Sequence, residues 1–194
     1  MKQIAERIDI DDVCLLKDVG ALGVERYRMA ASQRSCRDLG ETMIILLGEE
    51  TGTARKDVVQ AIKDFREERR MDPNHRSIEG AFEYATGFAL FQGLLYRRAF
   101  NAADREHQYR LCIPEGVHSR MVIPGETLQR EVGYRERFLL EYHNGTIAGH
   151  QGRDKCLELM SRDVWWPRMY SDVRKWTVSC EHCAGERGAP GVKA

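Results

Sequence analysis

The sequence has no long hydrophobic run. Its longest stretch of consecutive apolar side chains is Met43 to Leu47, whereas a helix needs about 18 apolar residues to cross a bilayer. The N-terminal residues include acidic side chains and no hydrophobic core of a signal peptide. We therefore expect no membrane association and an intracellular location, in the nucleus or the cytoplasm.

An excess of charge of one sign is also missing. Lys and Arg together number 30, and Asp and Glu also number 30, so the formal net charge is zero. Overall charge therefore gives no argument for nucleic-acid binding. Residues 1–50 have a small acidic excess and residues 143–194 a small basic excess, so a nucleic-acid surface near the C-terminus is permitted but not demonstrated.

Cysteines are few and mostly far apart. The chain has 6 of them, and only Cys180 and Cys183 form a close pair. A secreted disulfide framework places more cysteines in a shorter chain, so we expect a reducing compartment. The other four cysteines have no partner at metal-ligand spacing, and we interpret them as small buried apolar residues. They are Cys14, Cys36, Cys112 and Cys156.

The most informative motif lies near the C-terminus. His143 and His150 are separated by six residues, and Cys180 and Cys183 by two. Two imidazoles and two thiolates suit tetrahedral Zn²⁺, and four protein ligands leave no coordination position for an activated water. The spacing therefore predicts a structural zinc site formed by His143, His150, Cys180 and Cys183, and no catalytic zinc.

Two other chemistries use similar residues. Cys180 and Cys183 could form a thiol–disulfide redox motif, but such motifs begin a helix, whereas this pair follows the end of a helical pattern. A hydrolytic zinc enzyme needs an open coordination position and a carboxylate base nearby. Structural zinc is therefore favoured over both.

The first two-thirds of the chain is predicted to form two regions. Residues 1–80 are expected to be a mostly helical region of undetermined role, in which Val58, Ile62 and Phe65 have helical spacing after a plausible N-cap at Thr53. Residues 81–125 are expected to form a small antiparallel β subdomain, with strands near residues 93–98, 109–114 and 119–124.

Residues 126–190 are predicted to form three helices around the metal. Leu128, Val132 and Leu139 have helical spacing, and His143 continues their series. A second helix carries Cys156, and a third begins at Pro167 and ends near Cys180. The predicted fold class is mainly α with a small antiparallel β segment, a zinc-stabilised three-helix bundle preceded by a small extension subdomain.

The segment Phe138–Arg187 resembles the zinc-binding (HHCC) N-terminal domain of gypsy-type LTR-retrotransposon integrases. The matching segments, in the order of the family, are Leu140–His143, Ala148–Gly152 with Lys155, Trp166–Met169, Asp172–Val173 and Cys180–Cys183. Upstream, Gly93–Arg97 and Arg110–Pro114 resemble the extension that precedes this domain. Cys156 stands where the family usually has Thr, which leaves the four ligands unchanged.

The resemblance implies a helix-turn-helix-like bundle that helps to assemble integrase multimers and to hold DNA ends. A catalytic core is not expected in this chain, so no enzymatic activity is expected. The basic side chains that are candidates for contacts to DNA phosphates are Arg153, Lys155, Arg162, Arg168, Arg174 and Lys175. Two alternatives stay open: these side chains form ordinary solvated helix faces, or the module is a protein–protein interaction remnant of a retroelement polyprotein with no DNA affinity.

Overall fold

The computed structural model describes residues 26–72, 75–101, 106–122, 127, 129–145 and 149–183. Its helices are α3 (Arg26–Ser35), α4 (Gly40–Thr51), α5 (Arg55–Glu68), α6 (Ile78–Ala85), α7 (Tyr134–Leu139), the π-helical turn η1 (Leu140–Asn144), α8 (Arg153–Asp163) and α9 (Met169–Ser179). Its strands are β1 (Phe88–Phe91), β2 (Leu94–Asn101), β3 (Glu106–Cys112), β4 (Val117–Val122), β5 (Gln129–Gly133) and β6 (Val164–Trp165). None of these helices is both long and apolar enough to cross a membrane.

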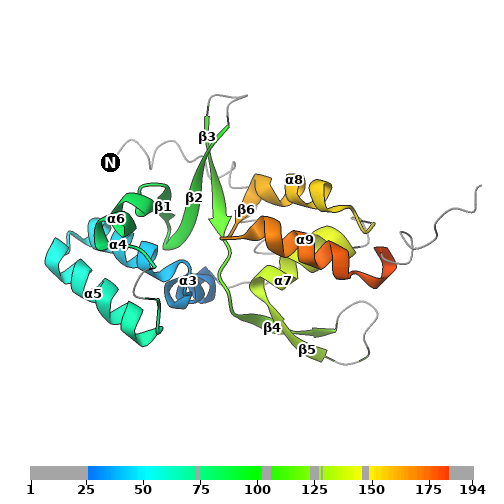
Figure 1. Ribbon diagram of the computed structural model, residues 1–194, viewed down its shortest axis with the longest axis horizontal. Helices are drawn as coiled ribbons and strands as arrows, with labels where there is room; N and C mark the ends of the chain where they lie inside the picture. The colour runs from blue at the N-terminus through cyan, green and yellow to red at the C-terminus, as the bar shows by residue number, and fades with distance from the viewer. Residues whose placement is uncertain are drawn as a thin grey trace, which may run out of the picture.

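A four-stranded sheet with the order β1-β2-β3-β6 lies between two groups of helices (Figure 1). Strands β1, β2 and β3 are antiparallel neighbours, as predicted, but β6 pairs with β3 in parallel. The sheet is therefore mixed: its part within residues 81–125 is antiparallel, as expected, and β6 from outside that range adds a parallel pair. Strand β6 has only two residues, too few to show the alternation by which a strand is recognised in a sequence.

Alternate residues of the strands face opposite helical layers, as the period of two in a strand requires. Leu95 of β2 and Cys112 of β3 pack with Leu39 and Met43 of the N-terminal helices. Their chain neighbours belong to a second cluster, on the side of the C-terminal helices. The central sheet thus has two buried faces.

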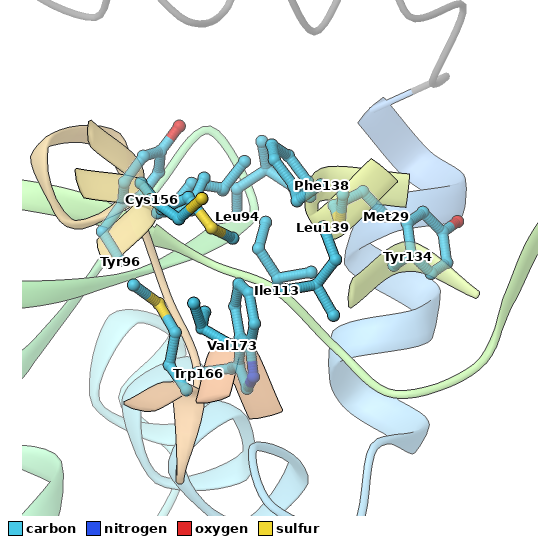
Figure 2. Packing of buried hydrophobic residues seen from close by; sticks show 14 of the residues in the cluster. Met29, Leu94, Tyr96, Ile113, Tyr134, Phe138, Leu139, Cys156, Trp166 and Val173 are labelled. Carbon is cyan, nitrogen blue, oxygen red and sulfur yellow. The ribbon is translucent and has the colours of Figure 1, made fainter. Parts of the chain in front are cut away.

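The largest core cluster joins parts of the chain that are far apart in sequence (Figure 2). Met29 of α3 packs in it with Leu94 of β2, Phe138 of α7 and Trp166, which is fully buried. This core contains residues from both sides of the boundaries expected after residues 80 and 125. The N-terminal helices and the C-terminal helices therefore share apolar contacts.

A buried glutamine joins α3 to the sheet where β2 and β3 stop pairing. The Gln33 side-chain oxygen accepts from the Leu95 N–H at 2.9 Å, and its nitrogen donates to the carbonyls of Leu95 at 3.2 Å and Cys112 at 2.7 Å. The last paired residues of the two strands are Tyr96 and Leu111. One residue beyond the last strand pair, the Gln33 amide therefore forms the backbone hydrogen bonds that a neighbouring strand would otherwise form.

Two predicted helix starts differ from the structure. Val132 was expected inside the first helix of the C-terminal region, but it lies in β5, which pairs with β4. Helix α7 begins at Tyr134 because Gly133 forms its N-cap, and the Glu136 carboxylate accepts from the Gly133 N–H at 3.4 Å. In the N-terminal region, Ala54 rather than Thr53 is the N-cap of α5. Leu128 lies outside the described residues.

Candidate metal centre

The four predicted ligands come from three places in the fold. His143 is in η1 and is buried, whereas His150 is in the turn between η1 and α8. Cys180 is the residue that ends α9, and Cys183 lies in the helical turn that follows. The last three are half-buried. The structure thus brings together side chains that are 3 to 40 positions apart in the sequence.

A tight turn places His150 beside His143. Gly149 and His150 have φ values of 57° and 56°, both in the left-handed region, which histidine adopts more readily than most non-glycine residues. The His150 N–H donates to the His143 carbonyl at 2.9 Å, and the Gly149 N–H donates to the Gly145 carbonyl at 3.1 Å. These bonds close the loop and fix the distance between the two imidazoles.

Two nitrogen–sulfur pairs among the donor atoms have nearly the separation found between ligands of a tetrahedral metal. One nitrogen or sulfur atom from each of the four side chains lies within 4.8 Å of the others. Cys180 Sγ is 3.3 Å from His150 Nδ1, and Cys183 Sγ is 3.5 Å from His143 Nε2. Tetrahedral zinc with ordinary Zn–N and Zn–S bonds places its nitrogen and sulfur ligands about 3.6 Å apart. The residues therefore fit a metal with two nitrogen and two sulfur ligands.

The orientation of His143 is fixed from the opposite side of its ring. His143 Nδ1 is 2.8 Å from the Gln151 carbonyl oxygen, and because a carbonyl only accepts, Nδ1 carries the proton. Nε2 is then unprotonated and has a lone pair directed toward the cluster. The carbonyl of Gln151 was not predicted from the sequence, since a backbone group has no residue-type signal.

Cys156 lies beside the cluster but is not one of its donors. Its sulfur donates to the Gln151 carbonyl at 3.1 Å and the Tyr142 carbonyl at 3.4 Å. Burial, and to a smaller extent the nearby Cys183, raises the pKa of the Cys156 thiol, so this group stays protonated. The prediction that Cys156 is a small buried residue is confirmed, as it is for Cys36 and Cys112; Cys14 lies outside the described residues.

The tryptophans hold the helices around the cluster. Trp176 Nε1 donates to Asn144 Oδ1 at 2.9 Å, which attaches α9 to the turn that bears His143. Trp166 Nε1 donates to Asp172 Oδ2 at 2.9 Å at the beginning of α9. Both indoles also pack with the largest core cluster, Trp166 as a buried member and Trp176 against its edge. Trp165, by contrast, packs against Phe88 on the other face of the sheet.

Half of the candidate DNA contacts are paired with carboxylates on their own helix. On α8, Arg153 bonds to Asp154, and both Lys155 and Arg162 bond to Glu158 at 2.9 and 2.7 Å. With Asp163 included, α8 has three acidic and three basic side chains and no net charge. On or next to α9, the exposed basic side chains with no ion pair among the described residues are Arg168, Arg174 and Lys175.

Comparison with known proteins gives a match over the segment that contains the cluster. Residues 132–187 match the family model of the integrase zinc binding domain. All four donors lie inside the match, and the site has the two-histidine, two-cysteine composition of an integrase zinc-binding domain. The resemblance seen in the sequence is confirmed for this segment. The match does not extend to the upstream sheet or to the N-terminal helices.

Individual relatives agree with the family match. The chain is 29% identical over 65 residues to proteins called Gypsy retrotransposon integrase-like protein 1 from Macaca fascicularis, Pongo abelii and Homo sapiens. The aligned region is 34% of this chain but only 11% of each relative. No solved structure matches the chain.

Proposed function

We propose that this chain is a non-catalytic zinc-binding module of the retrotransposon-integrase type that binds DNA, supports integrase multimerisation, or does both. The observation that supports it most directly is the cluster of two imidazole nitrogens and two thiols inside the integrase-type segment. We place this activity in the nucleus or the cytoplasm. No strand-transfer chemistry is assigned to the described residues.

The proposed metal is structural Zn²⁺ held by His143, His150, Cys180 and Cys183. With four protein ligands the coordination sphere is closed, so the ion polarises no substrate and activates no water. Its role is to connect η1, the turn before α8 and the end of α9. Binding of structural zinc to small modules contributes an apparent ~10–16 kcal/mol, which is enough to decide whether such a unit folds.

The proposed DNA surface on this module is the outer side of α9. Arg168, Arg174 and Lys175 are exposed there and have no carboxylate partner in the described part of the chain. Such side chains position a duplex through its phosphates and read little sequence. The three basic side chains of α8 are weaker candidates, because carboxylates already neutralise them.

DNA binding by the zinc-loaded chain tests this proposal. Wild-type protein and Arg174→Gln/Lys175→Gln are titrated into a labelled duplex between 50 and 200 mM salt. The logarithm of the association constant should fall linearly with the logarithm of salt concentration, and the double variant should have a slope smaller by about 2. Absence of wild-type binding at 50 mM salt would rule out the DNA function.

Exposed apolar side chains on α9 support protein association as the second candidate. Tyr170 and Val178 have exposed fractions of 53% and 59%, and contact with another chain would remove this apolar surface from water. Under this alternative, Tyr170→Ser/Val178→Ser lowers the apparent mass in sedimentation without changing DNA affinity. A monomeric wild-type protein that binds DNA would leave only the first candidate.

A further inference from the structure

A group of arginines and aromatic rings lies on the sheet face that is covered by the N-terminal helices. The Arg97 guanidinium carbon is 4.6 Å from the centroid of the Phe88 ring, 5.2 Å from that of Trp165 and 5.5 Å from that of Tyr84. These residues come from β2, β1, β6 and α6. A guanidinium stacked on aromatic rings keeps the N–H groups at its edge available for other acceptors.

Two further arginines adjoin Arg97. Arg110 of β3 is its direct cross-strand neighbour, and Arg76 places its guanidinium carbon 3.7 Å from the centroid of the Tyr84 ring. Like charges directly opposite each other destabilise a sheet. Within the described residues, none of these arginines has a carboxylate within ion-pair distance. In the described part of the chain, these three positive charges therefore have no carboxylate that compensates them.

The cluster is also partly removed from water. All three arginines are half-buried, and the Nε atom of Arg110 is buried with no hydrogen-bond partner. Burial lowers the pKa of the Arg110 guanidinium, but an arginine stays charged at neutral pH. Partly desolvated charges interact more strongly with an anion than fully exposed ones do, because water screens them less.

Gly87 provides room for this arrangement. A Cβ atom at position 87 would lie 2.9 Å from Nη1 and 3.3 Å from Cζ of Arg97. The Gly87 carbonyl meanwhile accepts from the Arg98 N–H at 2.8 Å. The glycine thus allows the guanidinium to lie close to the backbone and against the rings.

We propose that Arg76, Arg97 and Arg110 form a second nucleic-acid contact, which takes the phosphodiester backbone, on the sheet away from the metal centre. The inference rests on the DNA-binding function proposed above and adds a surface that lies outside the integrase-type segment. Guanidinium groups bind two phosphate oxygens at once through their N–H edges. The surface has three such groups at spaced positions, whereas α8 offers only charges that are already paired.

The salt dependence of duplex binding tests this second surface. Full-length, zinc-loaded Arg97→Gln/Arg110→Gln is compared with Lys56→Gln/Lys63→Gln, which removes two exposed positive charges from α5. The sheet variant should reduce the salt slope by about 2, one for each lost phosphate contact, and the α5 variant should leave it unchanged. Zinc content and circular dichroism check that each variant is folded.

Two single variants cover the case in which loss of the stacked Arg97 impairs folding. Arg110→Gln removes a like-charged neighbour and a buried unpaired Nε, so it should fold at least as well as wild type and still reduce the slope by about 1. Gly87→Ala keeps every charge but displaces the Arg97 guanidinium, so it should weaken binding.

The outcomes separate the two proposals. If the sheet variants bind like wild type while Arg174→Gln/Lys175→Gln binds more weakly, the second surface is refuted and DNA binding by α9 stands. If wild type binds no duplex at low salt, the DNA function and the second surface both fall. If polyglutamate of equal charge displaces the duplex as well as unlabelled DNA does, the surface takes an acidic protein, which also overturns the inference.

Discussion

His143 is the most constrained side chain of the candidate metal centre. It is buried, one ring nitrogen is fixed by the Gln151 carbonyl, and the other lies 3.5 Å from Cys183 Sγ. A substitution here removes a metal donor and one of the two hydrogen bonds to the Gln151 carbonyl, which keeps only the bond from Cys156 Sγ. His150 and the two cysteines are half-buried, so their loss removes a donor with less disturbance of packing.

We expect Cys183→Ser to bind less than one zinc per chain and His143→Ala to lose both zinc and folded structure. The reason is that three remaining donors hold zinc less tightly, and that structural zinc contributes much of the folding energy of such units. Zinc is measured by mass spectrometry of the metal, and the fold by circular dichroism.

Cobalt-substituted wild type should show the spectrum of two thiolate ligands and no exchangeable water.

His75→Gln is the matched control for these ligand variants. His75 is exposed and is not part of the cluster, so the variant should retain one zinc per chain. Full zinc content in Cys183→Ser would contradict the assignment of that residue as a ligand.

Gln33→Ala should destabilise the fold by about 2–4 kcal/mol. The substitution removes three buried hydrogen bonds and leaves backbone groups of Leu95 and Cys112 unsatisfied, each of which has a net cost of about 1 kcal/mol or more. Urea unfolding measures the change. Gln60→Ala, on the exposed side of α5, should change stability by no more than about 0.5 kcal/mol. Equal effects of the two substitutions would show that Gln33 does not support the sheet.

At the level of elements, the sequence predicted best where a regular pattern is long. Val58, Ile62 and Phe65 recur at helical spacing and are the buried residues of α5. The expected strands near residues 93–98 and 109–114 correspond to β2 and β3. The prediction of a helix at Val132 was wrong. The spacing of Val132 suits a helix, but pairing with β4 places it in a strand. Such long-range pairing leaves no local signal in the sequence.

Gly40 at the start of α4 gives a prediction about how the N-terminal helices pack. A Cβ atom there would lie 2.3 Å from Cζ of Phe65 and 2.6 Å from the Arg34 carbonyl oxygen. Gly40→Ala should therefore push α4 away from α5 and cost about 1–3 kcal/mol or more, as overpacking does. Thermal unfolding measures this cost.

Gly152→Ala is the control for Gly40→Ala. No atom lies within 4 Å of a Cβ atom at position 152, and the φ value of −63° suits any residue. Because Gly152 is the N-cap of α8, where alanine is less favourable than glycine, this substitution should cost about 0.5–1 kcal/mol without any overpacking. A similar small effect of Gly40→Ala would mean that α4 and α5 are not in close contact at this point.

For the whole molecule, the main feature is a core that residues from distant parts of the chain share. The sequence suggested three regions, 1–80, 81–125 and 126–190, and the largest core cluster contains residues from all three. Apolar contacts between Met29, Leu94 and Trp166 depend on three-dimensional proximity, which no local pattern encodes. The spacing of the two histidines and two cysteines, by contrast, was enough to single out the cluster, because metal ligands must be of particular types and lie in local pairs.

We expect zinc chelation to loosen more of the chain than residues 138–187. Because α3 and the sheet bury apolar side chains against the helices that carry the four candidate ligands, loss of the metal should increase amide exchange in α3, β2 and β3 as well. Hydrogen–deuterium exchange with and without a chelator measures this, with helix α5 as the internal reference. Increased exchange confined to residues 138–187 would show that the zinc-linked part unfolds independently.

The two-residue strand β6 makes the chain length between α8 and α9 critical. Trp165 lies on one side of the sheet with Phe88, and Trp166 lies on the other with Val173. Deleting or inserting one residue here would exchange the destinations of the two indoles, directing each large ring into a space shaped for the other. Changes of length should thus be tolerated in surface turns but not in this short link, where a single residue assigns each tryptophan to its own half of the protein.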